Sequence, residues 1–104
     1  MPVWEDEPDA VVITDSKQQL KKPPLYKVLL HNDDYTTMDF VVLILKNVFH
    51  KSSTDSYRIM MAVHQQGIGV AGVYTYEIAE TKIDKVTSMA REHDFPLLCT
   101  MEEE

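Results

Sequence analysis

The sequence predicts an α+β fold, a two-layer sandwich in which three helices cover a three-stranded antiparallel sheet. Short apolar runs of strand length occur at three places, and three longer stretches between them show apolar residues at helical spacing. Turn or capping residues separate these stretches, which follow in the order strand, helix, helix, strand, helix, strand. The strands therefore offer one face to cover, and the helices are available to cover it.

The first part of the chain, residues 1–24, shows no sustained apolar period and ends in Lys22-Pro23-Pro24. Proline favours extended backbone at its own position and at the residue before it, so this end is expected to be a stiff hinge. We expect residues 1–24 to form a mobile N-terminal extension and residues 25–104 to form one domain. That domain has about 80 residues, enough for one modest core.

The run Leu25–His31 is short and apolar, which predicts a strand, and Asn32-Asp33-Asp34 ends it with a strong turn signal. We expect a helix to begin after this turn, with Thr36 as its N-cap and Asp39 closing a capping box. Apolar residues at helical spacing should face the sheet. They are Val41, Ile44, Leu45 and Val48.

A second helix is predicted over about Ser53–Gln66, because Gly67 is a suitable C′ residue. Met60 and Val63 share one face of this helix. An adjacent face carries Tyr57, Met61 and His64. The run Ile68–Tyr74 then predicts the second strand.

Thr75 is expected to cap a third helix over about Tyr76–His93. Its buried stripe should be formed by Ala79, Ile83, Val86 and Ala90. Pro96 prevents further helix, and Leu97–Met101 predicts a last short strand.

Composition and charge exclude several classes of function. The 104 residues have a formal net charge of −7, which disfavours binding to the phosphates of nucleic acid. No apolar run approaches the roughly 18–20 residues of a membrane span, and the N-terminus lacks the cationic and apolar regions of a signal peptide. The single cysteine, Cys99, excludes an internal disulfide and a cysteine-based zinc cluster. We expect a cytoplasmic protein without a membrane or nucleic-acid partner.

Residues that could support catalysis are sparse. Cys99 lies in an apolar run, which predicts a buried and inert thiol. The four histidines show no close metal-ligand spacing, and the three glycines fit a turn and a strand better than a phosphate loop. We therefore expect no enzyme activity, no cofactor and no metal site.

Two polar features remain after these exclusions. Asn32-Asp33-Asp34 stands at the end of a strand, immediately before a capped helix, and turn formation alone could explain it. His64 shares a helix surface with Met60 and Met61, where a partly buried, hydrogen-bonded histidine is the simpler interpretation. Neither feature decides the function by itself.

Several short motifs occur in one order along residues 22–101. They are Lys22-Pro23-Pro24, Tyr26-Lys27-Val28, Asn32-Asp33-Asp34-Tyr35-Thr36, Met38, Phe40-Val41, Met61-Ala62-Val63-His64, Gly67, Gly72-Val73, Glu77, Ala79-Glu80-Thr81-Lys82, Ala90-Arg91-Glu92 and Pro96-Leu97-Leu98-Cys99. In this order and register the sequence closely resembles the ClpS adaptor family. The resemblance implies a fold similar to the C-terminal domain of the ribosomal stalk protein.

The resemblance also implies a function without catalysis. ClpS adaptors bind proteins whose N-terminal residue is Leu, Phe, Tyr or Trp, an N-degron, and deliver them to the ClpA unfoldase of the ClpAP protease for degradation. The alternative is a structural or ribosome-associated module of the same fold that lacks a pocket. Asn32, Asp33 and His64 argue against this alternative, because such a module needs no site for an amine.

The family's site residues carry over by position. The resemblance implies that the substrate α-amino group is bound by Asn32, Asp33 and His64. It implies a hydrophobic pocket and rim formed by Asp34, Thr36, Met38, Val41, Val63 and Leu97. Glu77 and Lys82 match positions that contact ClpA, and residues 1–24 match the extension needed to hand over the substrate.

These assignments agree with the chemistry of a free N-terminus. Its pKa of about 7.7–8.0 makes it largely an ammonium with three donors at neutral pH. Burying such a group without acceptors is costly, whereas an amide oxygen, a carboxylate and a neutral imidazole can each accept a hydrogen bond. We expect Met38, at the rim, to clash with the second γ-branch of Ile or Val and to tolerate Leu and aromatic side chains.

Overall fold

The computed structural model describes residues 22–104, so most of the extension predicted for residues 1–24 lies outside the described residues. The elements are β1 (Leu25–His31), α1 (Met38–Asn47), α2 (Ser53–Gln66), β2 (Ile68–Thr75), α3 (Tyr76–Glu92) and β3 (Leu98–Glu103). This order confirms the predicted sequence of strands and helices. Each helix and strand boundary that was predicted falls within two residues of its expected position.

The three strands form one antiparallel sheet in the order β2-β1-β3. Leu30 in the central strand lies opposite Gly69 on one side and Cys99 on the other. The register between β1 and β2 shifts between Val28 and Leu29, which leaves Ala71 as an extra residue in β2. Because both pairings are antiparallel, β1 runs in the direction opposite to β2 and β3.

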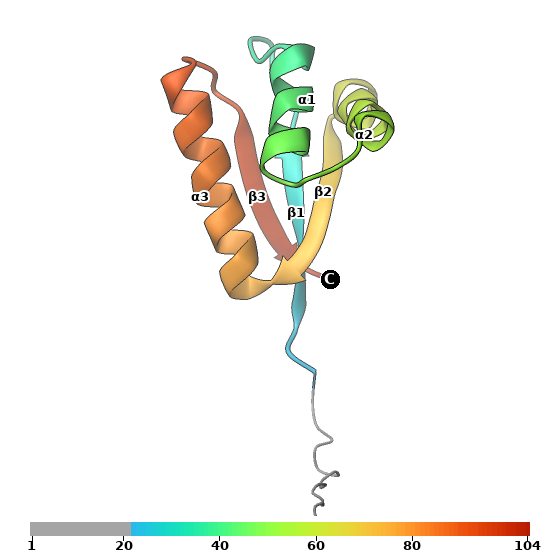
Figure 1. The fold of residues 1–104 in the computed structure, drawn as a ribbon, viewed down its shortest axis with the longest axis vertical. Helices are drawn as coiled ribbons and strands as arrows, with labels where there is room; N and C mark the ends of the chain where they lie inside the picture. Colours follow the sequence, from blue (N-terminus) through green and yellow to red (C-terminus); the bar gives the residue numbers. More distant parts are fainter. Residues whose placement is uncertain (1–21) are drawn as a thin grey trace, which may run out of the picture.

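The three helices pack against one face of this sheet, which forms the second layer (Figure 1). Val28 and Leu30 point from β1 into the core and are fully buried. The predicted inward residues of α1, which are Val41, Ile44, Leu45 and Val48, are all buried as expected. In α3 the stripe is confirmed except at Ile83, which is only partly buried.

The start of α1 differs from the prediction. Thr37, not Thr36, is the N-cap: its side chain accepts a hydrogen bond from the Phe40 backbone N–H at 3.1 Å. The Thr36 hydroxyl is directed to the Asp33 carboxylate instead. The predicted capping box of Thr36 and Asp39 is therefore wrong. Thr36 is hydrogen-bonded to Asp33 in the preceding turn, and the helix begins one residue later than predicted.

The end of α2 follows the prediction. Gly67 adopts the left-handed conformation with φ of 88°, and its N–H donates to the Val63 carbonyl. This turn leads directly into β2 and brings the last turn of α2 beside the end of β1, where the Asn32 N–H donates to the Gly67 carbonyl at 2.9 Å. Among residues 22–104, no helix has the length and apolar character needed to cross a membrane.

Candidate functional site

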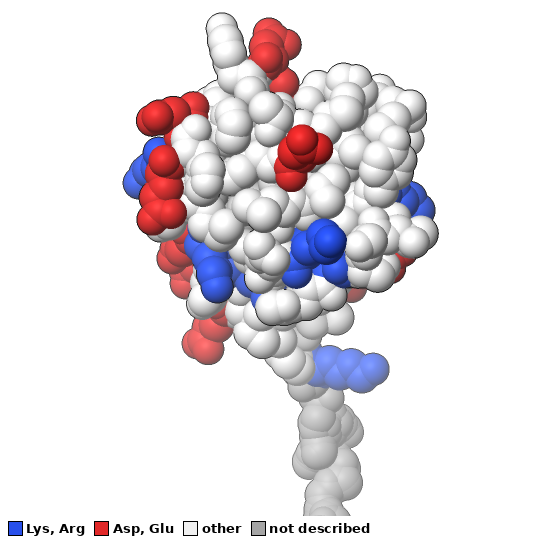
Figure 2. Space-filling view, turned by 45° about the horizontal axis from the view of Figure 1, so that its top comes forward, with Lys and Arg blue, Asp and Glu red and all other residues white. Residues whose placement is uncertain are grey.

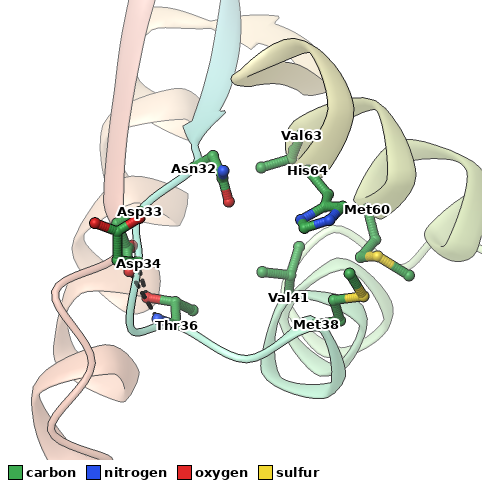
Figure 3. Close-up of a pocket in the computed structure, with 9 residues that line it drawn as sticks. All are labelled: Asn32, Asp33, Asp34, Thr36, Met38, Val41, Met60, Val63 and His64. Atoms are coloured by element: carbon green, nitrogen blue, oxygen red, sulfur yellow. Dashed lines mark hydrogen bonds between the residues drawn. The ribbon is translucent and has the colours of Figure 1, made fainter.

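A pocket with a volume of about 320 Å³ opens at the end of the molecule where β1 ends and α1 begins, the upper end in Figure 1. It lies between the turn after β1, the first turns of α1 and the last turns of α2 (Figure 3). Its lining residues are Asn32, Asp33, Asp34, Thr36, Met38, Val41, Met60, Val63 and His64. Residues from three separate segments thus enclose one cavity.

The turn on one side of the pocket is built around the Asp33 carboxylate. Its Oδ1 accepts hydrogen bonds from the backbone N–H groups of Tyr35 at 2.8 Å and Thr36 at 2.7 Å. Its Oδ2 accepts the Thr36 hydroxyl at 2.7 Å. Burial raises the pKa of Asp33, but the three hydrogen bonds lower it more, so this pKa lies below its ordinary value. The carboxylate is therefore held ionised and fixed.

Two further polar side chains face the cavity. Asn32 extends into it from the end of β1, and His64 extends into it from α2 on the opposite side (Figure 3). Both residues remain exposed to solvent. The amide and the imidazole are therefore accessible to a ligand that enters between them.

The deeper wall of the pocket is apolar. Val41 from α1 and Met60 and Val63 from α2 are buried there, with Met38 above them at the rim, where 42% of its surface stays exposed. Met60 is a lining residue that the sequence interpretation did not assign to the pocket. Its position, one helical turn before His64, was the available signal.

Gly69 sets the distance between α2 and the sheet. A Cβ atom at this position would lie 2.7 Å from Val63 Cγ2 and 3.3 Å from the Ile59 carbonyl oxygen. The absence of a side chain therefore lets α2 pack directly on β2. This close contact fixes the helix that carries Val63 and His64.

Leu97 does not lie with the other residues assigned to the pocket. It is buried in the core just before β3, with 6% of its surface exposed, and it is not part of the pocket lining. The structure brings the other predicted pocket and amine-site residues together.

Glu77 and Lys82 lie on α3, away from the pocket. Glu77 is exposed in the first turn of the helix, at the opposite end of the sheet. Lys82 Nζ donates a hydrogen bond to the Val48 carbonyl at 2.8 Å and lies 5.3 Å from the centre of the Tyr74 ring. Lys82 therefore attaches α3 to the C-terminal end of α1, a contact that the sequence did not indicate.

Charge is unevenly distributed over the face that contains the upper end of the molecule (Figure 2). Acidic and uncharged side chains occupy most of its upper part, and basic side chains lie mainly below them. Asp33 and Asp34 add two carboxylates to the pocket itself. A cationic group is therefore favoured at this end of the molecule.

The cysteine is remote from this chemistry. Burial raises the pKa of the Cys99 thiol to about 12, so it is protonated at neutral pH, as the sequence interpretation expects of an inert thiol. Within residues 22–104, no three His, Cys, Asp or Glu side chains are grouped so that they could hold a metal ion.

The fold and the pocket define a small binding module, with an apolar cavity next to an amide, a carboxylate and an imidazole. Comparison with known proteins then identifies the family. The model of the family "ATP-dependent Clp protease adaptor protein ClpS" matches residues 21–100. The chain belongs to the ClpS family.

Relatives and a solved structure agree with this assignment. The ClpS adapter of Myxococcus xanthus is 64% identical over 100 residues, covering 94% of each chain. The ClpS adapter of Phenylobacterium zucineum is 56% identical over 95 residues, covering 91% of this chain and 87% of the relative. The structure of Agrobacterium tumefaciens ClpS2 bound to L-phenylalaninamide is similar with a TM-score of 0.77 and 46% identity, covering 80% of this chain and 100% of that one.

Proposed function

We propose that this chain is a non-enzymatic adaptor that binds the free N-terminal residue of N-degron proteins, with Leu, Phe, Tyr or Trp at that position. It delivers them to the ClpA unfoldase of the ClpAP protease for degradation. The observation that carries this proposal is the joining of apolar walls and polar acceptors in one pocket. The similar ClpS2 structure, which holds an amino acid amide with a free amine, supports it.

The amine is bound between Asn32, Asp33 and His64. An ammonium has three donors, and the Asn32 amide oxygen and a neutral His64 nitrogen can each accept one of them. Asp33 already accepts three hydrogen bonds within the turn, so about one of its four lone-pair sites remains for the ammonium. Its main contribution is a fixed negative charge beside the amine. A blocked amine loses both the charge and two donors.

The first side chain enters the apolar part of the cavity. Contact with Val41, Met60 and Val63 removes it from water, which contributes about 1.5–3 kcal/mol for a large apolar side chain. Met38 narrows the rim and excludes side chains branched at Cβ. Asp34 and Thr36 complete the rim, whereas Leu97 contributes to the core behind it.

Delivery requires a second surface, which we assign to α3. Glu77 is exposed and free to contact the unfoldase. The Lys82 ammonium has one donor directed to Val48, so two donors remain for a partner. We assign the handing-over of the substrate to residues 1–24, which precede the core domain of residues 25–104. A cytoplasmic location fits the free thiol of Cys99.

A peptide array with all twenty first residues, synthesised with free and with acetylated amines, tests the proposed function. Binding should be confined to free amines and to Leu, Phe, Tyr and Trp. Equal binding of all first residues would exclude selection by this pocket. A pull-down that enriches ribosomal factors instead of ClpA would favour the ribosome-associated module.

A further inference from the structure

A second hollow lies next to the pocket, across the turn that follows β1. Its volume is about 480 Å³, and it is lined by Tyr35, Arg91, Asp94, Phe95 and Pro96. Tyr35 comes from the turn, and the other four residues come from the end of α3 and the connection to β3. None of these residues has a role in binding the first residue of the substrate.

Hydrogen bonds hold the backbone of the two aromatic residues of this hollow. Tyr35 is 75% exposed, yet its backbone N–H is held by Asp33 Oδ1 at 2.8 Å. On the other side, the Phe95 N–H donates to the Ala90 carbonyl at 2.8 Å, and the Phe95 ring packs 4.8 Å from the ring of Phe40. Tyrosine is enriched among the residues that contribute most to binding at protein interfaces, because its ring offers a large contact area at a low cost in side-chain entropy.

The hollow is adjacent to the proposed site for the first residue and lies on the other side of the turn. Asp34 and Thr36 line the pocket, and Tyr35 between them lines the hollow. The carboxylate of Asp33 lines the pocket and also holds Tyr35. An extended chain advances about 3.3–3.6 Å per residue, so two or three residues that follow the first span roughly 7–11 Å, a reach suited to a neighbouring site.

We propose that this hollow binds an aromatic side chain at the third or fourth position of the polypeptide whose first residue fills the pocket. The inference rests on the proposed function, which it extends from one residue to a short segment. Aromatic character follows from four of the five lining residues. They supply the rings of Tyr35, Phe95 and Pro96 and the guanidinium of Arg91, which can stack on an aromatic face, and Asp94 is the one acidic residue beside them. The second residue spans the turn and is not selected by the hollow.

The test uses the full chain and peptides that begin with a free leucine and keep one second residue. Alanine or tryptophan is placed at the third or the fourth position, and binding is measured by titration calorimetry. Tryptophan at one of these positions should tighten binding to the parent about three- to tenfold. In Tyr35→Ala this gain should fall below about twofold, whereas Tyr35→Phe and the distant exposed Tyr76→Ala should retain it.

Leucinamide, which reaches only the pocket, separates the two proposals. It should bind the parent and Tyr35→Ala equally, and equal urea midpoints will show that the variant is folded. A parent that binds leucinamide but shows no gain from tryptophan at either position overturns this inference alone, as does a Tyr35→Ala variant that keeps the gain. A parent that does not bind leucinamide overturns the proposed function and this inference with it.

Discussion

Thr36 is bound to Asp33 twice: its hydroxyl donates to Oδ2 and its backbone N–H donates to Oδ1, both at 2.7 Å. Together with the bond from Tyr35, these contacts convert a polar turn into a rigid wall between two hollows. One carboxylate therefore shapes the wall of the pocket and supplies its fixed negative charge.

Replacing Asp33 by Asn should weaken the binding of a free-amine Leu peptide by about tenfold or more, since a charge-assisted hydrogen bond contributes about 1.5–3 kcal/mol. The Asn side chain can still accept the two backbone N–H bonds, so the turn is largely retained. Thr36→Val, which removes only the hydroxyl bond and keeps the charge, is the matched control and should lose less affinity. Equal losses in the two variants would mean that Asp33 acts through turn geometry and not through charge.

The stability contributed by Asp33 should depend on pH in a defined direction. Its pKa is lowered in the folded chain, so its contribution is fully present above the unfolded pKa of about 3.9 and is lost as the pH falls toward the folded pKa. The free-energy difference of unfolding between the parent and Asp33→Asn, measured with urea, should therefore be larger at pH 6 than at pH 3. A difference that stays constant over this range would show that ionised Asp33 does not stabilise the turn.

Met38→Ala should admit Ile and Val as first residues, because the side chain that narrows the rim is removed. The ratio of Leu to Val peptide affinities, compared between variant and parent, is the measurement. Met38 is 42% exposed, so the fold should tolerate the change. If the ratio does not decrease, another residue excludes β-branched side chains.

Lys82→Met should destabilise the domain by about 1–2 kcal/mol, because the Val48 carbonyl loses a charged donor while the apolar stem is kept. The Lys82 ammonium also lies over the rings of Tyr74 and Phe49, which adds to the loss. Lys85→Met, an exposed position of the same helix, should leave the urea midpoint unchanged. If Lys82→Met also leaves the urea midpoint unchanged, Lys82 does not stabilise the fold, and only a role in binding a partner remains for it.

The fold was predictable because its signals are local. The apolar spacing of Val41, Ile44 and Val48 identifies the buried face of α1, and Gly67 ends α2 where its left-handed conformation is needed. Thr36 and Thr37 are adjacent, so the local sequence does not show which of them is the N-cap of α1. The choice depends on the Asp33 carboxylate, which binds Thr36 and leaves Thr37 to cap the helix.

The site was less predictable because it depends on contacts between distant segments. The resemblance indicated Asn32, Asp33 and His64. Periodicity alone does not predict that a turn and a helix about 30 residues later line the same cavity. The contact between Lys82 and Val48 joins residues 34 positions apart and has no sequence signal. Similarly, the need for Gly69 becomes evident only when Val63 is seen against it.

The central claim is that the pocket binds a free amine and an apolar side chain together. Its most direct test is a calorimetric titration of the full chain with one peptide that begins with Leu, compared with the same peptide acetylated at its N-terminus. The account predicts saturable binding of the free peptide and loss of binding by two orders of magnitude or more, about 2.7 kcal/mol, on acetylation. Equal affinity for both peptides would contradict it.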